Sequence, residues 1–118
     1  AYKTIYPYTD EVLKEYANNT AEDLEAALAK GHALYKKWRK VDNLSERKAQ
    51  LHKVAEILRR DCDKYAEIMT HDMGKLFREG KFEISVCADI ADYFADKAEE
   101  FLAPEKFETE AGHAYCVK

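Results

Sequence analysis

Apolar side chains recur every three or four positions through the middle of the chain, which is the pattern of amphipathic helices. Three such stretches follow one another, over residues 20–41, 43–73 and 76–102. We expect their apolar stripes to be the faces that pack together. The stripe positions are Leu24, Leu28, Tyr35 and Trp38 in the first stretch, Leu51, Val54, Leu58, Tyr65 and Met69 in the second, and Cys87, Ile90, Ala91, Phe94, Ala98 and Phe101 in the third.

Residues that favour helix ends bracket these stretches. Thr20 is placed to cap the first helix, and Asn43 with Glu46 three residues later has the pattern of a capping box. Gly74 can adopt the left-handed conformation that ends a helix, and Pro104 stops the third stretch. The pattern therefore predicts three long helices.

Both ends of the chain predict β-hairpins instead. Residues 3–6 and 12–16 are rich in β-branched and aromatic side chains, and Pro7 lies in a turn between them. Near the other end, apolar and acidic residues alternate until Gly112, and a second strand has only begun at Lys118. We therefore expect a mostly α fold with a short hairpin at each end, over residues 1–19 and 105–118.

Composition narrows the class of protein. The 118 residues are 47% hydrophobic and 36% charged, with a net charge of −4, which is typical of a soluble chain. No apolar run is long enough to cross a membrane, no secretory leader is visible, and the mild acidity argues against nucleic acid as the main partner. Cys62, Cys87 and Cys116 lie far apart with no CxxC pair, so we expect free thiols and a cytoplasmic location.

No self-contained active site is visible in the residues. The four glycines form no phosphate-binding loop. His52 and Glu56 have i, i+4 spacing, which is more typical of a surface contact than of a metal site. Cys62 and Cys87 lie on or beside apolar stripes, where we expect desolvation to oppose thiol activation.

Several short strings, in order, resemble the N-terminal segment of the aldehyde dehydrogenase superfamily. The sequences of these strings are most similar to those of bacterial succinate-semialdehyde dehydrogenase-like members. The resemblance covers essentially the whole chain, which corresponds to a single incomplete segment of such an enzyme. The strings are residues 4–13, residues 21–28, Trp38-Arg39-Lys40 with Glu46-Arg47, His71-Asp72-Met73-Gly74-Lys75, and residues 88–95.

The resemblance implies a parent enzyme that oxidises an aldehyde, such as succinate semialdehyde, to the acid with NAD or NADP. It places the cofactor fold, the nucleophilic cysteine and the general-base glutamate outside these residues, so we expect no catalysis and no bound cofactor in this segment alone. It further implies a structural monovalent cation at Ile5 and Asp72. By the same resemblance Val86, Cys87 and Ile90 would line a substrate tunnel, although ordinary core positions are the other interpretation of these three residues.

The resemblance also implies partners. These are the remainder of an aldehyde dehydrogenase chain and further copies, which would associate through unpaired strands and exposed apolar stripes. Two alternatives stay open from the residues alone. The chain could be a free-standing helical interaction module, or residues 36–40 could form a basic site for phosphate or nucleic acid.

Overall fold

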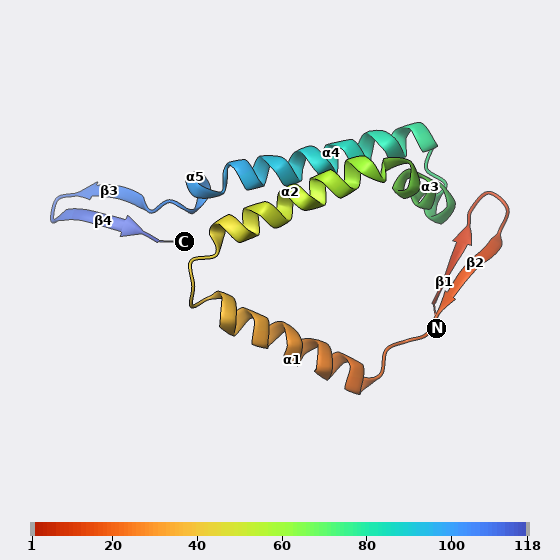
Figure 1. The fold of residues 1–118 in the computed structure, drawn as a ribbon, viewed down its shortest axis with the longest axis horizontal. Helices are drawn as coiled ribbons and strands as arrows, with labels where there is room; N and C mark the ends of the chain where they lie inside the picture. Colours follow the sequence, from red (N-terminus) through yellow and green to blue (C-terminus); the bar gives the residue numbers. More distant parts are fainter. Residues whose placement is uncertain (1, 118) are drawn as a thin grey trace.

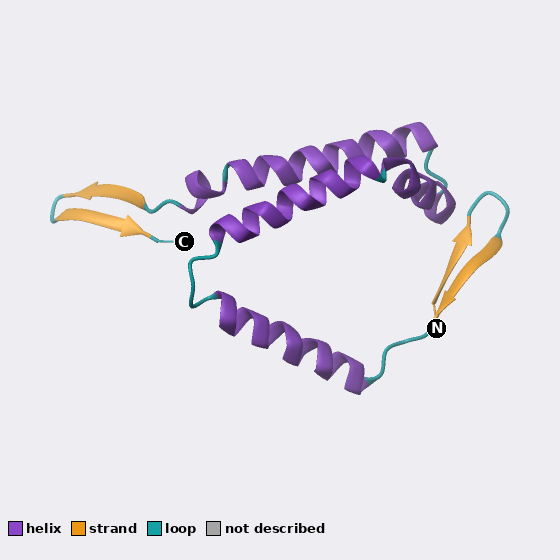
Figure 2. Cartoon of the chain, viewed as in Figure 1, coloured by secondary structure: helices purple, strands orange, loops and turns teal. Residues whose placement is uncertain are grey.

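The computed structural model describes residues 2–117 and arranges them as an open, mostly helical chain (Figure 1). A two-stranded hairpin lies at each end of these residues with helices between, as the pattern predicts (Figure 2). Ala1 and Lys118, which the predicted hairpins include, lie outside the described residues. The elements are β1 (Tyr2–Tyr6), β2 (Glu11–Tyr16), α1 (Ala21–Trp38), α2 (Leu44–Arg60), α3 (Cys62–Met73), α4 (Phe77–Asp96), α5 (Ala98–Leu102), β3 (Glu105–Thr109) and β4 (Gly112–Cys116).

The N-terminal hairpin forms where its turn residues predict it. The carbonyl of Tyr6 accepts hydrogen bonds from the amides of Thr9 (3.3 Å) and Asp10 (2.9 Å), which closes the turn after Pro7. Asp10 has a φ of 59°, and aspartate tolerates that left-handed conformation better than most residues do. Pairing of the strands is irregular between Thr4 and Ile5, where β2 carries one additional residue.

Helix α1 begins as predicted and lies apart from the other helices (Figure 1). Thr20 and Asp23 form a reciprocal capping box, in which the Asp23 amide donates to the Thr20 hydroxyl (3.1 Å) and the Thr20 amide donates to the Asp23 carboxylate (2.9 Å). No described residue of α1 is buried. The predicted stripe of Leu24, Leu28 and Tyr35 is therefore solvent-exposed.

The helix predicted over residues 43–73 is two helices. It breaks at Asp61, which leaves helical geometry (φ −104°, ψ 23°), and α3 turns away from the line of α2. The capping box expected at Asn43 is also wrong, because its side-chain amide donates to the Trp38 carbonyl (3.2 Å) and makes no cap bond. Gly74 ends α3 with a φ of 72°, as predicted.

The stretch predicted over residues 76–102 is also divided. It breaks at Lys97, where ψ rises to 1°, and a one-turn helix, α5, follows. The break lets Phe101 approach Phe94 and Tyr93, with ring centroids 6.0 Å from each. These aromatic rings tie α5 to the end of α4.

The described core is small, and it lies where α4 packs against α2 and α3. Its buried hydrophobic side chains are mostly alanines rather than the large residues of the predicted stripes. On α4 the prediction chose the wrong face, because Cys87, Ile90 and Phe94 are exposed. Small side chains allow two helix backbones to approach closely, so the alanine face makes the contact. The buried hydrophobic residues are Ala55, Ala66, Ile84, Ala88 and Ala95.

The overall shape is far from compact. Its radius of gyration is 20.8 Å, and its extents are 67 × 39 × 27 Å. A compact chain of this length has a radius of gyration of about 13 Å. The chain therefore leaves most of its large apolar side chains exposed to solvent.

The C-terminal hairpin is more complete than the sequence predicts. β4 matches β3 residue for residue, from Glu105 opposite Cys116 to Thr109 opposite Gly112, so the second strand is as long as the first. Gly112 takes a φ of 122° at the turn. Both strands are solvent-exposed along their length.

Across residues 2–117, the helices lack the combination of length and apolar character that a bilayer span requires.

Candidate functional site

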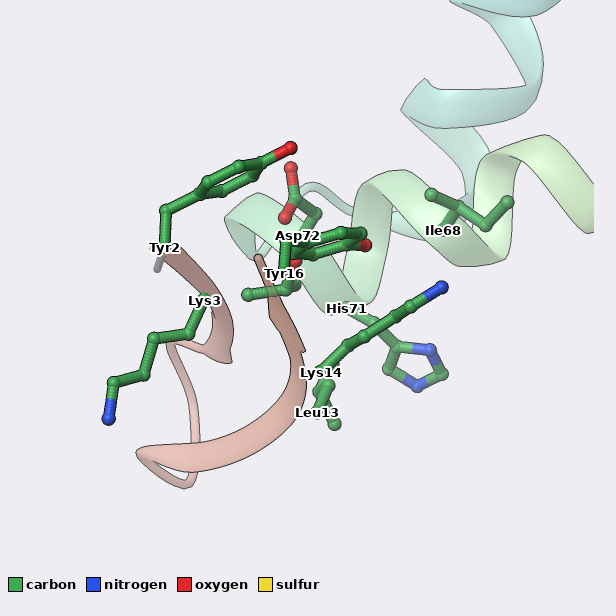
Figure 3. A pocket seen from close by; sticks show the side chains of 9 residues that line it. Tyr2, Lys3, Leu13, Lys14, Tyr16, Ile68, His71 and Asp72 are labelled. Carbon is green, nitrogen blue, oxygen red and sulfur yellow. The ribbon is translucent and has the colours of Figure 1, made fainter. Parts of the chain in front are cut away.

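The N-terminal hairpin packs against α3 and leaves a cavity of about 730 Å³ between them (Figure 3). Lys14 and Tyr16 of β2 form one wall, and Ile68, His71 and Asp72 of α3 form another. A lysine, a histidine and an aspartate therefore line one junction of the fold.

Aromatic contacts stabilise the hairpin, and one of them joins it to α3. The rings of Tyr2 and Tyr16 are stacked with centroids 4.8 Å apart, and the Lys14 ammonium lies 5.0 Å above the Tyr16 ring. The ring of Tyr6 meets His71 of α3 edge to face at 5.2 Å. Contacts of this kind each contribute on the order of 1 kcal/mol, so they hold a hairpin that would be marginal by itself.

Of the two residues expected at a cation site, Asp72 lies at this junction and Ile5 lies next to it in β1. Asp72 lines the cavity, and Ile5 follows Thr4, which also lines it. Hard cations prefer oxygen ligands, and here Asp72 supplies a carboxylate while Ile5 supplies only its backbone carbonyl. Among residues 2–117, no three histidine, cysteine, aspartate or glutamate side chains gather as a metal cluster. The donors fit a weakly held monovalent ion better than a transition metal.

The three residues expected to line a tunnel lie together on α4. Val86 and Ile90 are 38% and 49% exposed, and Cys87 is also exposed. The buried face of α4, with Ala88 as its central residue, lies against α2 on another side of the helix. These three residues are therefore not core within the described chain, and they form an apolar face that is open to contact.

The thiols are free, as predicted, in the part of the chain that the structure describes. Cys87 and Cys116 are exposed, which corrects the expectation that Cys87 is desolvated. Cys62 is half-buried, and its sulfur lies 3.7 Å from the carbonyl oxygen of Lys81. No imidazole contact to any of these thiols is found among the described residues.

A second cluster of functional groups, which we call the charged seam, runs along the contact between α2 and α4. Its basic members are Lys48, His52 and Arg59 of α2, and its acidic members are Asp89, Asp92 and Asp96 of α4 with Glu99 of α5. The shortest contacts are Lys48 to Glu99 (2.6 Å), His52 to Asp92 (2.7 Å), and Arg59 to Asp92 (2.6 Å) and to Asp89 (2.7 Å).

The seam changes the protonation behaviour of its members. Hydrogen bonds from His52 and Arg59 lower the pKa of Asp92, and the bond from Lys48 lowers the pKa of Glu99. The carboxylates of Asp89 and Asp92 raise the pKa of Arg59. The sequence predicted only outward-facing acids here, because local spacing does not reveal partners that lie 30 or more residues apart.

The sequence of the chain was compared with those of known proteins. The sequence model of the Aldehyde dehydrogenase family matches residues 1–118. The succinate-semialdehyde dehydrogenase [NADP(+)] of Deinococcus radiodurans is 29% identical over 113 residues, which are 96% of this chain and 24% of that protein. The enzyme of the same name from Mycobacterium leprae is 32% identical over 108 residues, or 92% of this chain and 23% of that protein. The chain thus spans about a quarter of the length of these relatives.

The fold agrees with the sequence match. The crystal structure of succinic semialdehyde dehydrogenase from Streptococcus pyogenes, in complex with NADP+, superposes with a TM-score of 0.96 and 64% identity. The superposition covers all of this chain and 26% of that one, and it matches the N-terminal part of the fold. From its sequence and its fold, this chain belongs to the aldehyde dehydrogenase family.

Proposed function

We propose that the chain is the N-terminal segment of an NADP-dependent dehydrogenase that oxidises succinate semialdehyde to the acid. The relatives from Deinococcus radiodurans and Mycobacterium leprae are named succinate-semialdehyde dehydrogenase [NADP(+)], and the Streptococcus pyogenes structure is a complex with NADP+. In this proposal the remaining three quarters of the enzyme bind the cofactor and carry the reacting groups. The segment supplies structure and a substrate-facing surface.

The observation that carries the proposal is the open conformation itself. Exposed apolar side chains tend to collapse onto each other in water, yet α1 stays apart from the other helices. The same conformation occurs in a solved relative in which three quarters of the chain lie outside the match. The remainder of that larger chain is therefore the partner that the open shape fits. A free-standing interaction module would bury more of its own stripes.

We infer a tunnel-lining role for the exposed face of α4. Val86, Cys87 and Ile90 present an apolar surface that α2 and α3 do not cover, and packing against α2 fixes the helix that carries them. A narrow apolar wall suits the carbon chain of a short aldehyde, while polar groups elsewhere would recognise its charged end.

We also infer a weak monovalent-cation site at Asp72 and the backbone carbonyl of Ile5. The support is that β1, which carries Ile5, packs against α3, and that Asp72 of α3 lines the cavity where they meet. If a cation stabilises this junction, sodium chloride or potassium chloride will raise the melting temperature of the chain. The increase will be larger than the one caused by tetramethylammonium chloride at the same ionic strength. Asp72→Asn should abolish that difference, and equal stabilisation by all three salts would contradict the site.

The main experiment compares the chain alone with a chimera. The chimera joins residues 1–118 to the part of the Streptococcus pyogenes enzyme that the chain does not cover. With succinate semialdehyde and NADP, the chain alone should produce no NADPH and the chimera should produce it steadily. Turnover by the chain alone, or a folded chimera that binds NADP without turnover, would refute the proposal.

A variant of the chimera tests the tunnel face. Ile90→Trp should raise the KM for succinate semialdehyde by about tenfold, equivalent to roughly 1.4 kcal/mol of binding, because the indole narrows the path. Ser85→Trp introduces the same side chain at another position on α4 and serves as the matched control. Equal effects of the two substitutions would argue against a substrate-facing role for Ile90.

We also propose an oligomeric state for the parent enzyme and a location in the cell. The exposed strands β3 and β4 retain free edges that can pair with another copy, so we propose that the parent enzyme is a homo-oligomer. Light scattering after size exclusion should find the chimera larger than a monomer, and a monomer would contradict this part. A cytoplasmic location is proposed from the free thiols.

A further inference from the structure

The imidazole of His52 lies between two carboxylates of α4. Its Nδ1 is 2.7 Å from an oxygen of Asp92, and its Nε2 is 3.4 Å from an oxygen of Asp96. A neutral imidazole carries one N–H group and can donate to only one of them. The contact to Asp92 is a hydrogen bond and the contact to Asp96 is an ion-pair distance, so only the doubly protonated ring presents an N–H group to each carboxylate.

We propose that His52 is a pH-dependent clasp that holds the C-terminal half of α4 against α2. When the ring is doubly protonated, it joins α2 to both Asp92 and Asp96. When pH rises and one proton leaves, a lone pair faces a carboxylate oxygen, and that side of the clasp opens. The proposal is independent of the enzymatic function of the parent.

The groups around His52 on α2, α4 and α5 are paired with one another and keep fixed charges near neutral pH. From α4, Asp92 also accepts a hydrogen bond from Arg59 (2.6 Å), and these bonds lower the pKa of Asp92, so it stays ionised down to acidic pH. From α5, Glu99 is paired with Lys48. On α2 itself, Glu56 pairs with Lys53 (2.8 Å). Lysine, arginine and these carboxylates keep their charges between about pH 5 and 8, the range in which histidine loses its own.

The position of the clasp determines which part of the molecule responds. At every pH in this range Arg59 holds Asp89 and one oxygen of Asp92, and Lys48 holds Glu99 of α5. His52 holds Asp92 and Asp96, which are the last turns before α5. Beneath them, the packed residues Ala88 and Ala95 supply little apolar area, so polar contacts matter more here than in a core of large side chains. Loss of the clasp should therefore loosen the last turn of α4 around Asp96, while Arg59 and Lys48 still join α4 and α5 to α2.

The test compares thermal unfolding of the chain, followed by helical circular dichroism, at pH 6 and pH 8. His52→Gln keeps a hydrogen-bond donor but cannot acquire charge, and His32→Gln on the isolated helix α1 is the matched control. The drop in melting temperature from pH 6 to pH 8 should be about 1–4 °C smaller in His52→Gln than in the unmodified chain. In His32→Gln the melting temperature should drop between pH 6 and pH 8 by as much as it does in the unmodified chain. If His52→Gln retains the full drop, the clasp is refuted.

A second measurement needs no variant. In NMR spectra of the unmodified chain, the backbone amide resonances of Asp92 and Asp96 should move with pH in step with the imidazole signals of His52. The amide of Asp89 should move much less. In 1 M NaCl the coupled movement should shrink, because the pair is solvent-accessible and salt screens it. If the imidazole titrates while the Asp92 and Asp96 amides stay still, the proposal is wrong.

Discussion

A Cβ atom built on Gly80 of α4 would lie 3.2 Å from both the Cα and the Cβ of Ala66 in α3. The two helix backbones therefore touch at this point, with no room for a side chain on α4. The contact explains why the chain bends at Asp61, because α3 must leave the line of α2 to reach the start of α4. One glycine and one alanine thus set the angle of the helical corner.

Filling this contact should destabilise the helical corner. Gly80→Leu replaces a poor helix former with a good one, yet we expect it to lower the free energy of unfolding by about 1–3 kcal/mol because the side chain overpacks the contact. Gly31→Leu is the matched control, since nothing lies within 4 Å of a Cβ built at Gly31 in α1. The control should gain up to about 1 kcal/mol. Urea unfolding measures both, and a stabilised Gly80→Leu would contradict the close contact.

Helix α1 depends on its cap more than the other helices do, because it has no buried face. Thr20→Ala removes the hydroxyl that accepts from the Asp23 amide, which costs typically about 1 kcal/mol. Amide hydrogen exchange in the first turn of α1 should accelerate about fivefold, while exchange in α4 stays unchanged. Asn43→Ala, which removes a side chain without a cap bond, should leave the first turn of α2 unaffected. A global change in exchange would argue that α1 packs on its neighbours.

The same cap predicts an acid-dependent loss of α1. Hydrogen bonds from the Thr20 backbone and hydroxyl lower the pKa of Asp23 in the folded chain. A carboxylate with a lowered pKa stabilises the fold at pH values above its unfolded pKa, and the contribution disappears as pH falls through the folded value. Helical signal from α1 should therefore decline below about pH 4, and Asp23→Asn should flatten that decline. An unchanged profile in Asp23→Asn would contradict the role of the carboxylate.

Thiol labelling should separate the three cysteines and report on the partner of α4. In the chain alone, Cys87 and Cys116 should react rapidly with an aromatic disulfide reagent, and half-buried Cys62 should react several-fold more slowly. In the chimera, Cys87 should become slow because the rest of the enzyme narrows access to this face. Cys87→Ser identifies its signal. Equal labelling of Cys87 in both proteins would show that its face stays open.

The order and kind of the elements were predictable from local pattern. Helical periodicity, the Thr20 cap, the turn at Pro7 and the stop at Gly74 depend on residues close together in sequence, and the structure confirms each of them. The break at Asp61 was not predictable, since it follows from the way α3 packs against α4, and the break at Lys97 accompanies the contact of Phe101 with Tyr93 and Phe94.

The faces of the helices were harder to predict than the helices. On α4, both the alanine side and the side with Ile90 are apolar, and periodicity alone favours the larger side chains. The larger side chains are left exposed because close approach to α2 selects Ala88 and Ala95. The same limit applies to the site residues. Asp72 and Ile5 were suggested by family resemblance, while the partners of His52 lie 40 or more residues away and leave no local signal.

The charged seam has a consequence for how separate copies of the chain recognise each other. All its basic members lie on α2, and its acidic members lie on α4 and α5. Two copies that met through α2 against α2, or through α4 against α4, would bring like charges together and repel. An exchange in which α4 and α5 of one copy replace those of the other would restore every pair. The segregation of charge therefore discourages mismatched dimers and leaves swapped ones as the permitted kind.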